Sequence, residues 1–210
     1  MKKKMIFVFL LFSLCFYAQS DDTATPSKFS FGVSGGVNFS NLLQSDGGNQ
    51  NSITGFHFMG FGEYRFSDKL SIQPGVAYSR QGAETDEMYD AESNTTTKFK
   101  IALDYVNVPI LLKYYVVKGF GVEAGPQIGF LTTAKAKDIF VDGESSDIDV
   151  DIKDMFKSVD FGIDVGVFYD FQQGFLVGGR YNYGVSDIAE DNPGDPITNS
   201  VFQLYLGFKY

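Results

Sequence analysis

Seven charged residues stand out in this 210-residue chain because the stretches around them alternate apolar with small polar residues. Side chains on the polar side of such a stretch share one face of a β-strand, and opposite charges on neighbouring strands can pair. Such a set can hold strands together, or it can line a pathway for ions or small solutes. The seven residues are Glu63, Arg65, Lys113, Glu123, Asp164, Arg180 and Lys209.

Two short turns predict which of these charges are partners. Lys113 and Glu123 lie five residues on either side of the centre of the turn "VKG", so they should be directly opposed. Asp164 and Arg180 fall within about one residue of register across the turn "QQG". Because an unpaired charge away from water is costly, we predict that the charges, with Glu63 and Arg65 among them, form structural pairs. A lined pathway is the alternative.

His57 is the only histidine of the chain and the one candidate for a general base. Alternation places it on the polar face, near one end of its strand. A base needs a partner that orients it, and no serine or acidic pattern accompanies His57 in the sequence. A lipid-modifying enzyme is therefore a minor alternative, and we expect no catalytic residue, cofactor or metal.

The elements that carry these residues are eight stretches of period-two hydrophobicity, which predict β-strands. Tight turns ("SDK", "VKG" and "QQG") alternate strictly with long connections along the chain. An up-and-down barrel with short periplasmic turns and long external loops has this pattern. The stretches lie near 28–40, 53–66, 70–82, 99–116, 120–134, 157–171, 175–187 and 200–210.

The first twenty residues differ from the rest. They begin with three lysines, continue with an apolar run and end in small residues, which is the pattern of a cleaved secretory signal peptide. We therefore predict a signal peptide over 1–20, a short N-terminal segment over 21–27 and a barrel domain over 28–210. Removing residues 1–20 changes the formal charge from −9 to −12, because three lysines and no acids leave with them. An exported acidic chain is unsuited to nucleic-acid binding.

Period-two alternation alone does not say which face is inside, because a soluble lipocalin-like barrel alternates too. Here the polar faces are small and mostly uncharged, which suits the narrow lumen of an eight-stranded barrel better than a water-facing surface. Large apolar side chains near the short turns predict an interfacial girdle, and Tyr210 would lie at the same boundary. The predicted girdle is Phe66, Leu70, Tyr114, Tyr115, Phe120, Phe168, Tyr169, Phe171 and Phe175.

The long connections are acidic. Between 135 and 156 the Asp142-Gly143 pair predicts a hairpin turn, so the strands 120–134 and 157–171 should continue beyond the membrane as a projecting hairpin. Alternate aspartates at 147, 149 and 151 lack the glycine and terminal glutamate of a calcium loop and predict a solvated acidic face.

The segments "FGVSGGVNFSNL", "LSIQPGVAYSRQGA", "LDYVNVPILLKYYVVKGFGVEAGPQIGFL" and "VDFGIDVGVFYDFQQGFLVGGRYNYGVSDI" together resemble the PorT-like outer-membrane β-barrel family. The resemblance covers nearly the whole chain after the leader. It implies an eight-stranded barrel in the outer membrane of a Gram-negative bacterium. It also implies an association with a gliding-associated secretion apparatus, and it supplies no catalytic residues.

We therefore predict an all-β, eight-stranded antiparallel up-and-down transmembrane β-barrel, monomeric, with a filled polar lumen. Its expected role is structural or interactional: envelope integrity, surface contact or an accessory part in protein secretion. Expected partners are outer-membrane lipids, lipopolysaccharide and envelope or secretion proteins, with no nucleic acid. The alternatives are a narrow channel, a lipid-modifying enzyme and a soluble periplasmic carrier.

Overall fold

The computed structural model describes residues 28–44, 51–84, 88–90, 95–141, 144–146, 149–190 and 194–210. The predicted signal peptide over 1–20 and the segment 21–27 lie outside these residues, as do the Asp142-Gly143 pair and Asp147.

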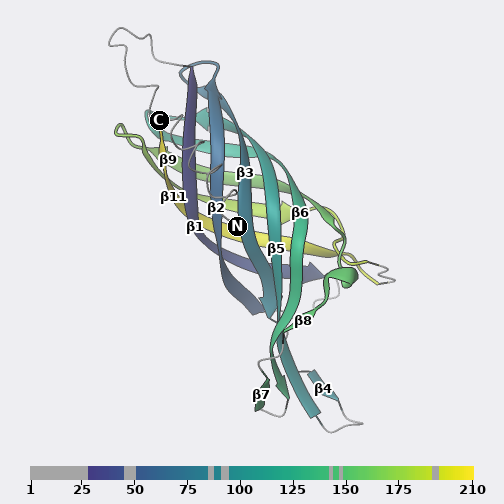
Figure 1. Ribbon diagram of the computed structural model, residues 1–210. Helices are drawn as coiled ribbons and strands as arrows, with labels where there is room; N and C mark the ends of the chain where they lie inside the picture. The colour runs from purple at the N-terminus through teal and green to yellow at the C-terminus, as the bar shows by residue number, and fades with distance from the viewer. Residues whose placement is uncertain are drawn as a thin grey trace, which may run out of the picture.

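Eight long antiparallel strands close into a barrel (Figure 1). Each strand pairs with its neighbour in the order β1-β2-β3-β5-β6-β9-β10-β11, and β11 pairs back with β1. No strand of this ring keeps a free edge, which is the condition for a sheet that spans lipid. The predicted eight-stranded up-and-down barrel is confirmed. Its strands are β1 (Phe29–Gln44), β2 (Asn51–Arg65), β3 (Leu70–Glu84), β5 (Thr95–Tyr115), β6 (Phe120–Val141), β9 (Val159–Asp170), β10 (Phe175–Gly184) and β11 (Ile197–Lys209).

The two faces of each strand have the orientation that the sequence predicts. On β1 the small polar residues Ser34 and Asn38 are buried, whereas Phe31 is 62% exposed. On β10 Arg180 is buried and Phe175 is 59% exposed. Apolar side chains therefore cover the outside of the barrel and polar ones fill the inside, which is the arrangement of a membrane barrel and the reverse of a lipocalin.

Three four-residue turns close one end of the barrel, here called the short-turn end; they are 66–69, 116–119 and 171–174. In each, the first residue donates its N–H to the carbonyl of the residue that begins the next strand, at 2.7–3.0 Å. Gly119 and Gly174 end their turns at φ of 84° and 86°, a conformation that glycine adopts at no steric cost. The opposite end carries the long connections and is here called the long-loop end.

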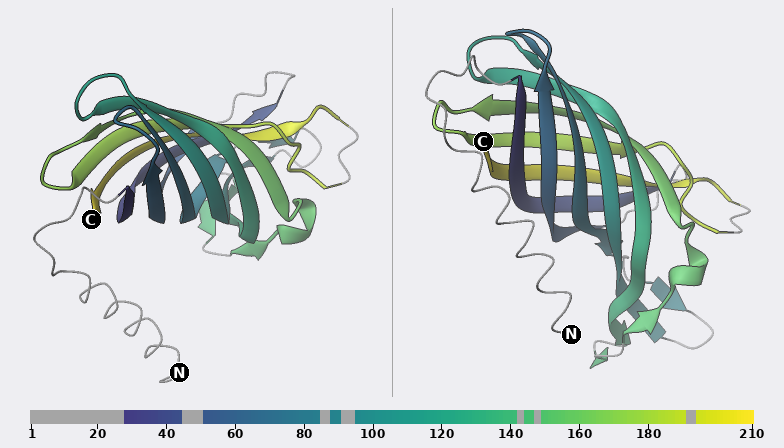
Figure 2. Two further views of the ribbon diagram at one scale, coloured as in Figure 1. Left: turned by 90° about the horizontal axis from the view of Figure 1, so that it is seen from above. Right: turned by 45° about the horizontal axis from the view of Figure 1, so that its top comes forward.

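At the long-loop end β5 and β6 continue together beyond the barrel, away from the carboxyl terminus (Figures 1 and 2). Two short strands, β4 (Met88–Asp90) and β7 (Glu144–Ser146), pair with their outer edges, so this projecting sheet has four strands. The predicted projection of β6 is found, but its main partner is β5 and not a continuation of 157–171, since β9 begins only at Val159. The return strand is also not continuous: it is divided into β7, β8 (Val150–Asp151) and a 3-10 turn, η2 (Lys153–Met155), before β9 begins.

Large apolar side chains ring the outside of the short-turn end, and several pack edge to face. The ring pairs Tyr64–Phe66, Tyr169–Phe171 and Phe175–Phe208 have centroids 5.2, 4.8 and 5.1 Å apart. Two predicted members of the girdle do not belong to it. Tyr115 and Phe168 are 5% and 2% exposed and pack against each other inside the lumen, because they share the strand face of the inward charges.

Within the described residues, no helix is long and apolar enough to cross a membrane.

Candidate functional site

The lumen of the barrel is filled by layers of polar side chains and is the candidate functional site. Its side chains come from all eight strands because each strand turns its polar face inward. The buried polar residues include Ser34, Asn38, His57, Glu63, Gln73, Ser79, Gln81, Asn107, Lys113, Glu123, Gln127, Asp160, Asp164, Arg180, Asn182, Asn199 and Gln203.

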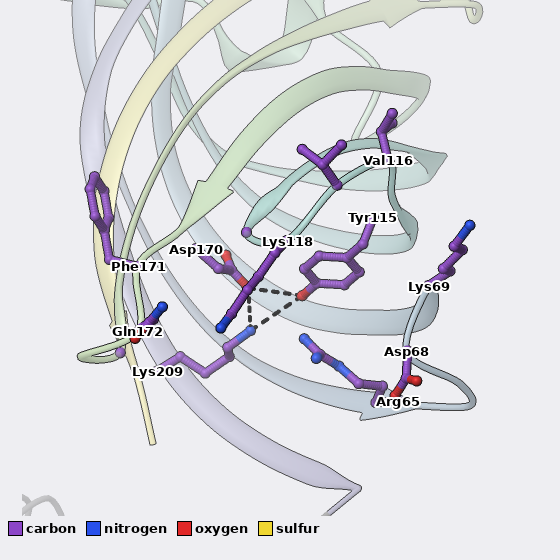
Figure 3. Close-up of a pocket in the computed structure, with 13 residues that line it drawn as sticks. Arg65, Asp68, Lys69, Tyr115, Val116, Lys118, Asp170, Phe171, Gln172 and Lys209 are labelled. Atoms are coloured by element: carbon purple, nitrogen blue, oxygen red, sulfur yellow. Dashed lines mark hydrogen bonds and ion pairs between the residues drawn. The ribbon is translucent and has the colours of Figure 1, made fainter.

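Five side chains form an ionic cluster at the short-turn end of the lumen (Figure 3). The Lys209 ammonium donates hydrogen bonds to Glu63 Oε2, at 2.9 Å, and to Asp170 Oδ2. The Tyr115 hydroxyl lies 2.8 Å from both Glu63 Oε1 and Asp170 Oδ2. Lys113 Nζ is 3.6 Å from Glu63 Oε2 and 3.8 Å from Asp170 Oδ1. Within the cluster two cations therefore balance two carboxylates, which limits the cost of burying charge, and Arg65 Nη2 lies 3.6 Å from Glu63 Oε1 at its edge.

A second ion pair lies deeper in the lumen. Arg180 Nε and Nη2 each lie 2.8 Å from Glu123 Oε1, and the Tyr205 hydroxyl donates to the same oxygen at 3.0 Å. The side chains of Arg180 and Glu123 are 4% and 0% exposed. Asp164 accepts a hydrogen bond from Asn182 Nδ2 at 2.9 Å.

The ion pairs differ from those that the turns predict. Lys113 does lie directly opposite Glu123, but its ammonium forms ion pairs with Glu63 and Asp170. Arg180 pairs with Glu123 and not with Asp164, which lies opposite Asn182 in the register. The prediction treated each hairpin as an isolated pair of strands, whereas long side chains in a narrow barrel reach past their neighbours.

Gly166 explains how Arg180 reaches Glu123 across an intervening strand. It lies on β9, opposite Glu123 on one side and opposite Arg180 on the other. A Cβ at this position would lie 3.1 Å from Glu123 Oε1 and 3.2 Å from the Arg180 Cα. Because glycine has no side chain, the guanidinium and the carboxylate meet directly over β9.

His57 belongs to a buried amide network in the half of the lumen toward the long loops. Its Nδ1 lies 2.7 Å from Asn38 Oδ1, which also accepts a hydrogen bond from Gln203 Nε2 at 3.2 Å. Asn38 Nδ2 donates to Ser79 Oγ at 2.9 Å, and Gln81 Nε2 donates to the same hydroxyl at 3.2 Å. The Ser79 hydroxyl is thus engaged by the amides of Asn38 and Gln81, and the described partner of the His57 ring is the Asn38 amide.

An apolar plug closes the lumen at the long-loop end. It combines inward residues of the strands with residues 152–156 and 188, which fold over the mouth. Ile188 is fully buried at its centre, and the flanking backbone is held by a bridge between Phe156 and Ala189. The plug consists of Leu42, Ala83, Leu103, Tyr105, Leu131, Ala134 and Ile188, with Ile101, Ile152, Phe156 and Ile197 packed against them.

Sequence reasoning missed Asp170 and the roles of Tyr115, Asn38 and Tyr205. Asp170 lies an even number of positions after Asp164 and shares its inward face, so alternation was a sufficient signal for it. The three other residues are hydrogen-bond partners across the lumen, for which a single strand carries no signal. Among the residues that the structure describes, no group of three potential metal ligands gathers.

An apolar exterior, a polar filled interior and a closed ring of eight tilted strands define a β-barrel of the outer-membrane class. Residues 17–190 match the family of the outer membrane protein beta-barrel domain, and the chain belongs to that family. The protein is accordingly located in the outer membrane.

Solved structures with a similar fold include those of several outer-membrane proteins. Ail, the attachment invasion locus protein of Yersinia pestis, is 15% identical with a TM-score of 0.47, over 88% of this chain and 100% of that one. A second structure of Ail, in complex with the heparin analogue sucrose octasulfate, has a TM-score of 0.48. The neisserial surface protein NspA is 18% identical, with a TM-score of 0.49 over 88% of this chain and 98% of that one. OprG of Pseudomonas aeruginosa is 15% identical, with a TM-score of 0.43 over 86% and 95%. No curated protein matches the sequence.

Proposed function

We propose that this chain is a non-catalytic, monomeric outer-membrane barrel with a closed lumen, whose role is structural and interactional. The observation that carries the proposal is that both ends of the lumen are filled, by the ionic cluster around Glu63 and Lys209 and by the apolar plug around Ile188. A lumen packed in this way holds strands together and leaves recognition to surfaces outside it.

The projecting sheet of β4, β5, β6 and β7 is the proposed contact surface for lipopolysaccharide or for envelope proteins. It extends past the barrel, and its outer strands are only three residues long, so it adds surface without a long free edge. The resemblance to PorT-like barrels makes an accessory role in protein secretion the finer form of the same proposal.

Conductance separates the closed barrel from the narrow-channel alternative. We expect the purified protein in planar bilayers to give no stepwise current, because the apolar plug fills the lumen at the long-loop end and the ionic cluster fills it at the short-turn end. The variant Asp164→Asn with Arg180→Gln should be equally silent. A wild-type current that changes in this variant would instead assign the lumen to ion or solute passage.

The proposed orientation places the long loops outside the cell and the short turns in the periplasm. The only cysteine is Cys15, in the predicted signal peptide, so single cysteines report position cleanly. We expect Met155→Cys, exposed at the long-loop end, to react with a membrane-impermeant maleimide on intact cells. Gln173→Cys, exposed in a short turn, should react only after the outer membrane is permeabilised. The reverse labelling pattern would contradict the orientation.

A further inference from the structure

A pocket of about 630 Å³ opens at the short-turn mouth of the barrel, next to the ionic cluster, whose residues Tyr115, Asp170 and Lys209 form part of its wall (Figure 3). All three short turns contribute to its wall, so its shape is set by the closure of the barrel and not by one flexible loop. Its volume falls in the range of small-molecule sites. The polar residues that line it are Arg65, Asp68, Lys69, Tyr115, Lys118, Asp170, Gln172 and Lys209.

The pocket is basic although the chain as a whole carries a formal charge of −9. Four cations line it against two carboxylates, and Asp170 is already bound by Lys209 and Tyr115. Lys69 and Lys118 form no ion pair with any residue that the structure describes. The mouth therefore holds positive charge that the protein itself does not neutralise.

Three of these cations converge. Figure 3 shows the charged ends of Arg65, Lys118 and Lys209 pointing toward one another across the pocket, whereas Lys69 points away from it. The Arg65 guanidinium lies over the Tyr115 ring, 4.4 Å from its centroid, and its Nη2 is 3.6 Å from Glu63 Oε1. Because a guanidinium has five N–H donors and Arg65 remains 42% exposed, donors are left for a ligand in the pocket.

We propose that this pocket binds the carboxylate of a soluble ligand, of the kind found at the carboxyl terminus of a peptide. The planar fork of Arg65 matches a carboxylate, and the apolar residues Val116, Val117 and Phe171 of the wall suit an aliphatic chain behind it. Asp68 and Asp170 would repel a phosphate dianion more strongly than a single negative charge.

The position of the pocket favours a ligand that arrives from water. The three turns surround it at the mouth of the lumen, whereas lipid head groups meet the outside of the barrel beside the aromatic girdle. That this water is periplasmic rests on the orientation proposed above, but the binding itself does not. If the pocket does not bind the ligand, the expected labelling and conductance results are unaffected.

The test uses the full barrel in nanodiscs of phosphatidylcholine and two probes, N-acetyl-trialanine with a free carboxylate and the same peptide as its amide. Affinities are measured by NMR titration, following the amide resonances of Gly119 and Gly174. We expect the free acid to bind at least about tenfold more tightly than the amide, since charge-assisted hydrogen bonds are lost in the amide.

Two lysine variants form a matched pair. Lys118→Gln should weaken binding of the free acid about tenfold, whereas Lys69→Gln, which removes the same charge from an equivalent turn, should change it by less than about twofold. Lys153→Gln, at the long-loop end, controls for net charge. All three lysines are exposed, so these variants are expected to fold.

Several outcomes would overturn the proposal. These are equal affinity for acid and amide, no binding of either probe, or equal effects of Lys118→Gln and Lys69→Gln. If phosphatidylglycerol added to the nanodiscs abolishes peptide binding in a Lys118-dependent way, the pocket belongs to a lipid head group and the assignment to a soluble carboxylate is wrong.

Discussion

Replacing Arg180 by methionine lowers the free energy of unfolding of the barrel by about 3–5 kcal/mol, because it leaves the Glu123 carboxylate buried without its cation. The Glu123 side chain is 0% exposed, and its remaining partner is the Tyr205 hydroxyl at 3.0 Å. Methionine keeps most of the length of arginine, so the loss comes from charge more than from a cavity. The chain has no tryptophan, and unfolding is therefore followed by circular dichroism in detergent with increasing denaturant.

Two further variants show whether the buried charge is responsible. Combining Arg180→Met with Glu123→Gln removes both charges and should restore more than half of the lost stability, because the buried Glu123 carboxylate is removed together with its cation. Lys135→Gln breaks an exposed pair, with side chains 39% and 43% exposed, and should change stability by no more than about 1 kcal/mol. If Arg180→Met is as mild as Lys135→Gln, the lumen pair is not structural.

Gly36→Ala is expected to prevent closure of the barrel. A Cβ at Gly36 would lie 1.8 Å from the carbonyl oxygen of Leu204, across the seam where β1 meets β11. The obstacle is backbone and not a flexible side chain, so relief requires the two closing strands to move apart. We expect a loss of at least about 3 kcal/mol, at the upper end of the effect of overpacking. Closure of the barrel is measured as the fraction of protein that migrates faster on a gel when the sample is not boiled.

Gly60→Ala is the matched control. Gly60 lies in the middle of β2, and a Cβ there would meet no atom within 4 Å. The control should keep the fast-migrating band and the wild-type stability within about 0.5 kcal/mol. A closed barrel from Gly36→Ala, or failure of both variants, would show that the seam is not the site of the clash.

The fold was predictable because its signals are local. Alternation over ten or more residues defines the two faces of each strand. On the strand that carries Phe31 and Phe39, the other face consists of small residues, which is not the composition of a surface that faces water. Tight turns such as 117–119 determine which strands are neighbours and in which register, as the direct opposition of Lys113 and Glu123 illustrates. The projecting sheet was only partly predicted, because β4 pairs with the start of β5 at Thr95–Thr97, and three consecutive threonines show no alternation of apolar and polar residues.

The contacts inside the lumen were less predictable. Lys209 and Glu63 come from opposite ends of the chain, and their 2.9 Å contact exists only once β1 and β11 have joined. The choice of Glu123 by Arg180 depends on the missing side chain of Gly166 on a third strand. No hairpin contains this information by itself.

The sequence by itself therefore determined the number of barrel strands, their order and the face that each turns to lipid, because period-two patterning and turn length act between residues close in the chain. The tertiary structure alone decided which lumen charges pair, how the ends are filled and where three cations converge on a pocket. These depend on distances across a closed ring only a few side chains wide, in which residues from strands far apart in the sequence become neighbours.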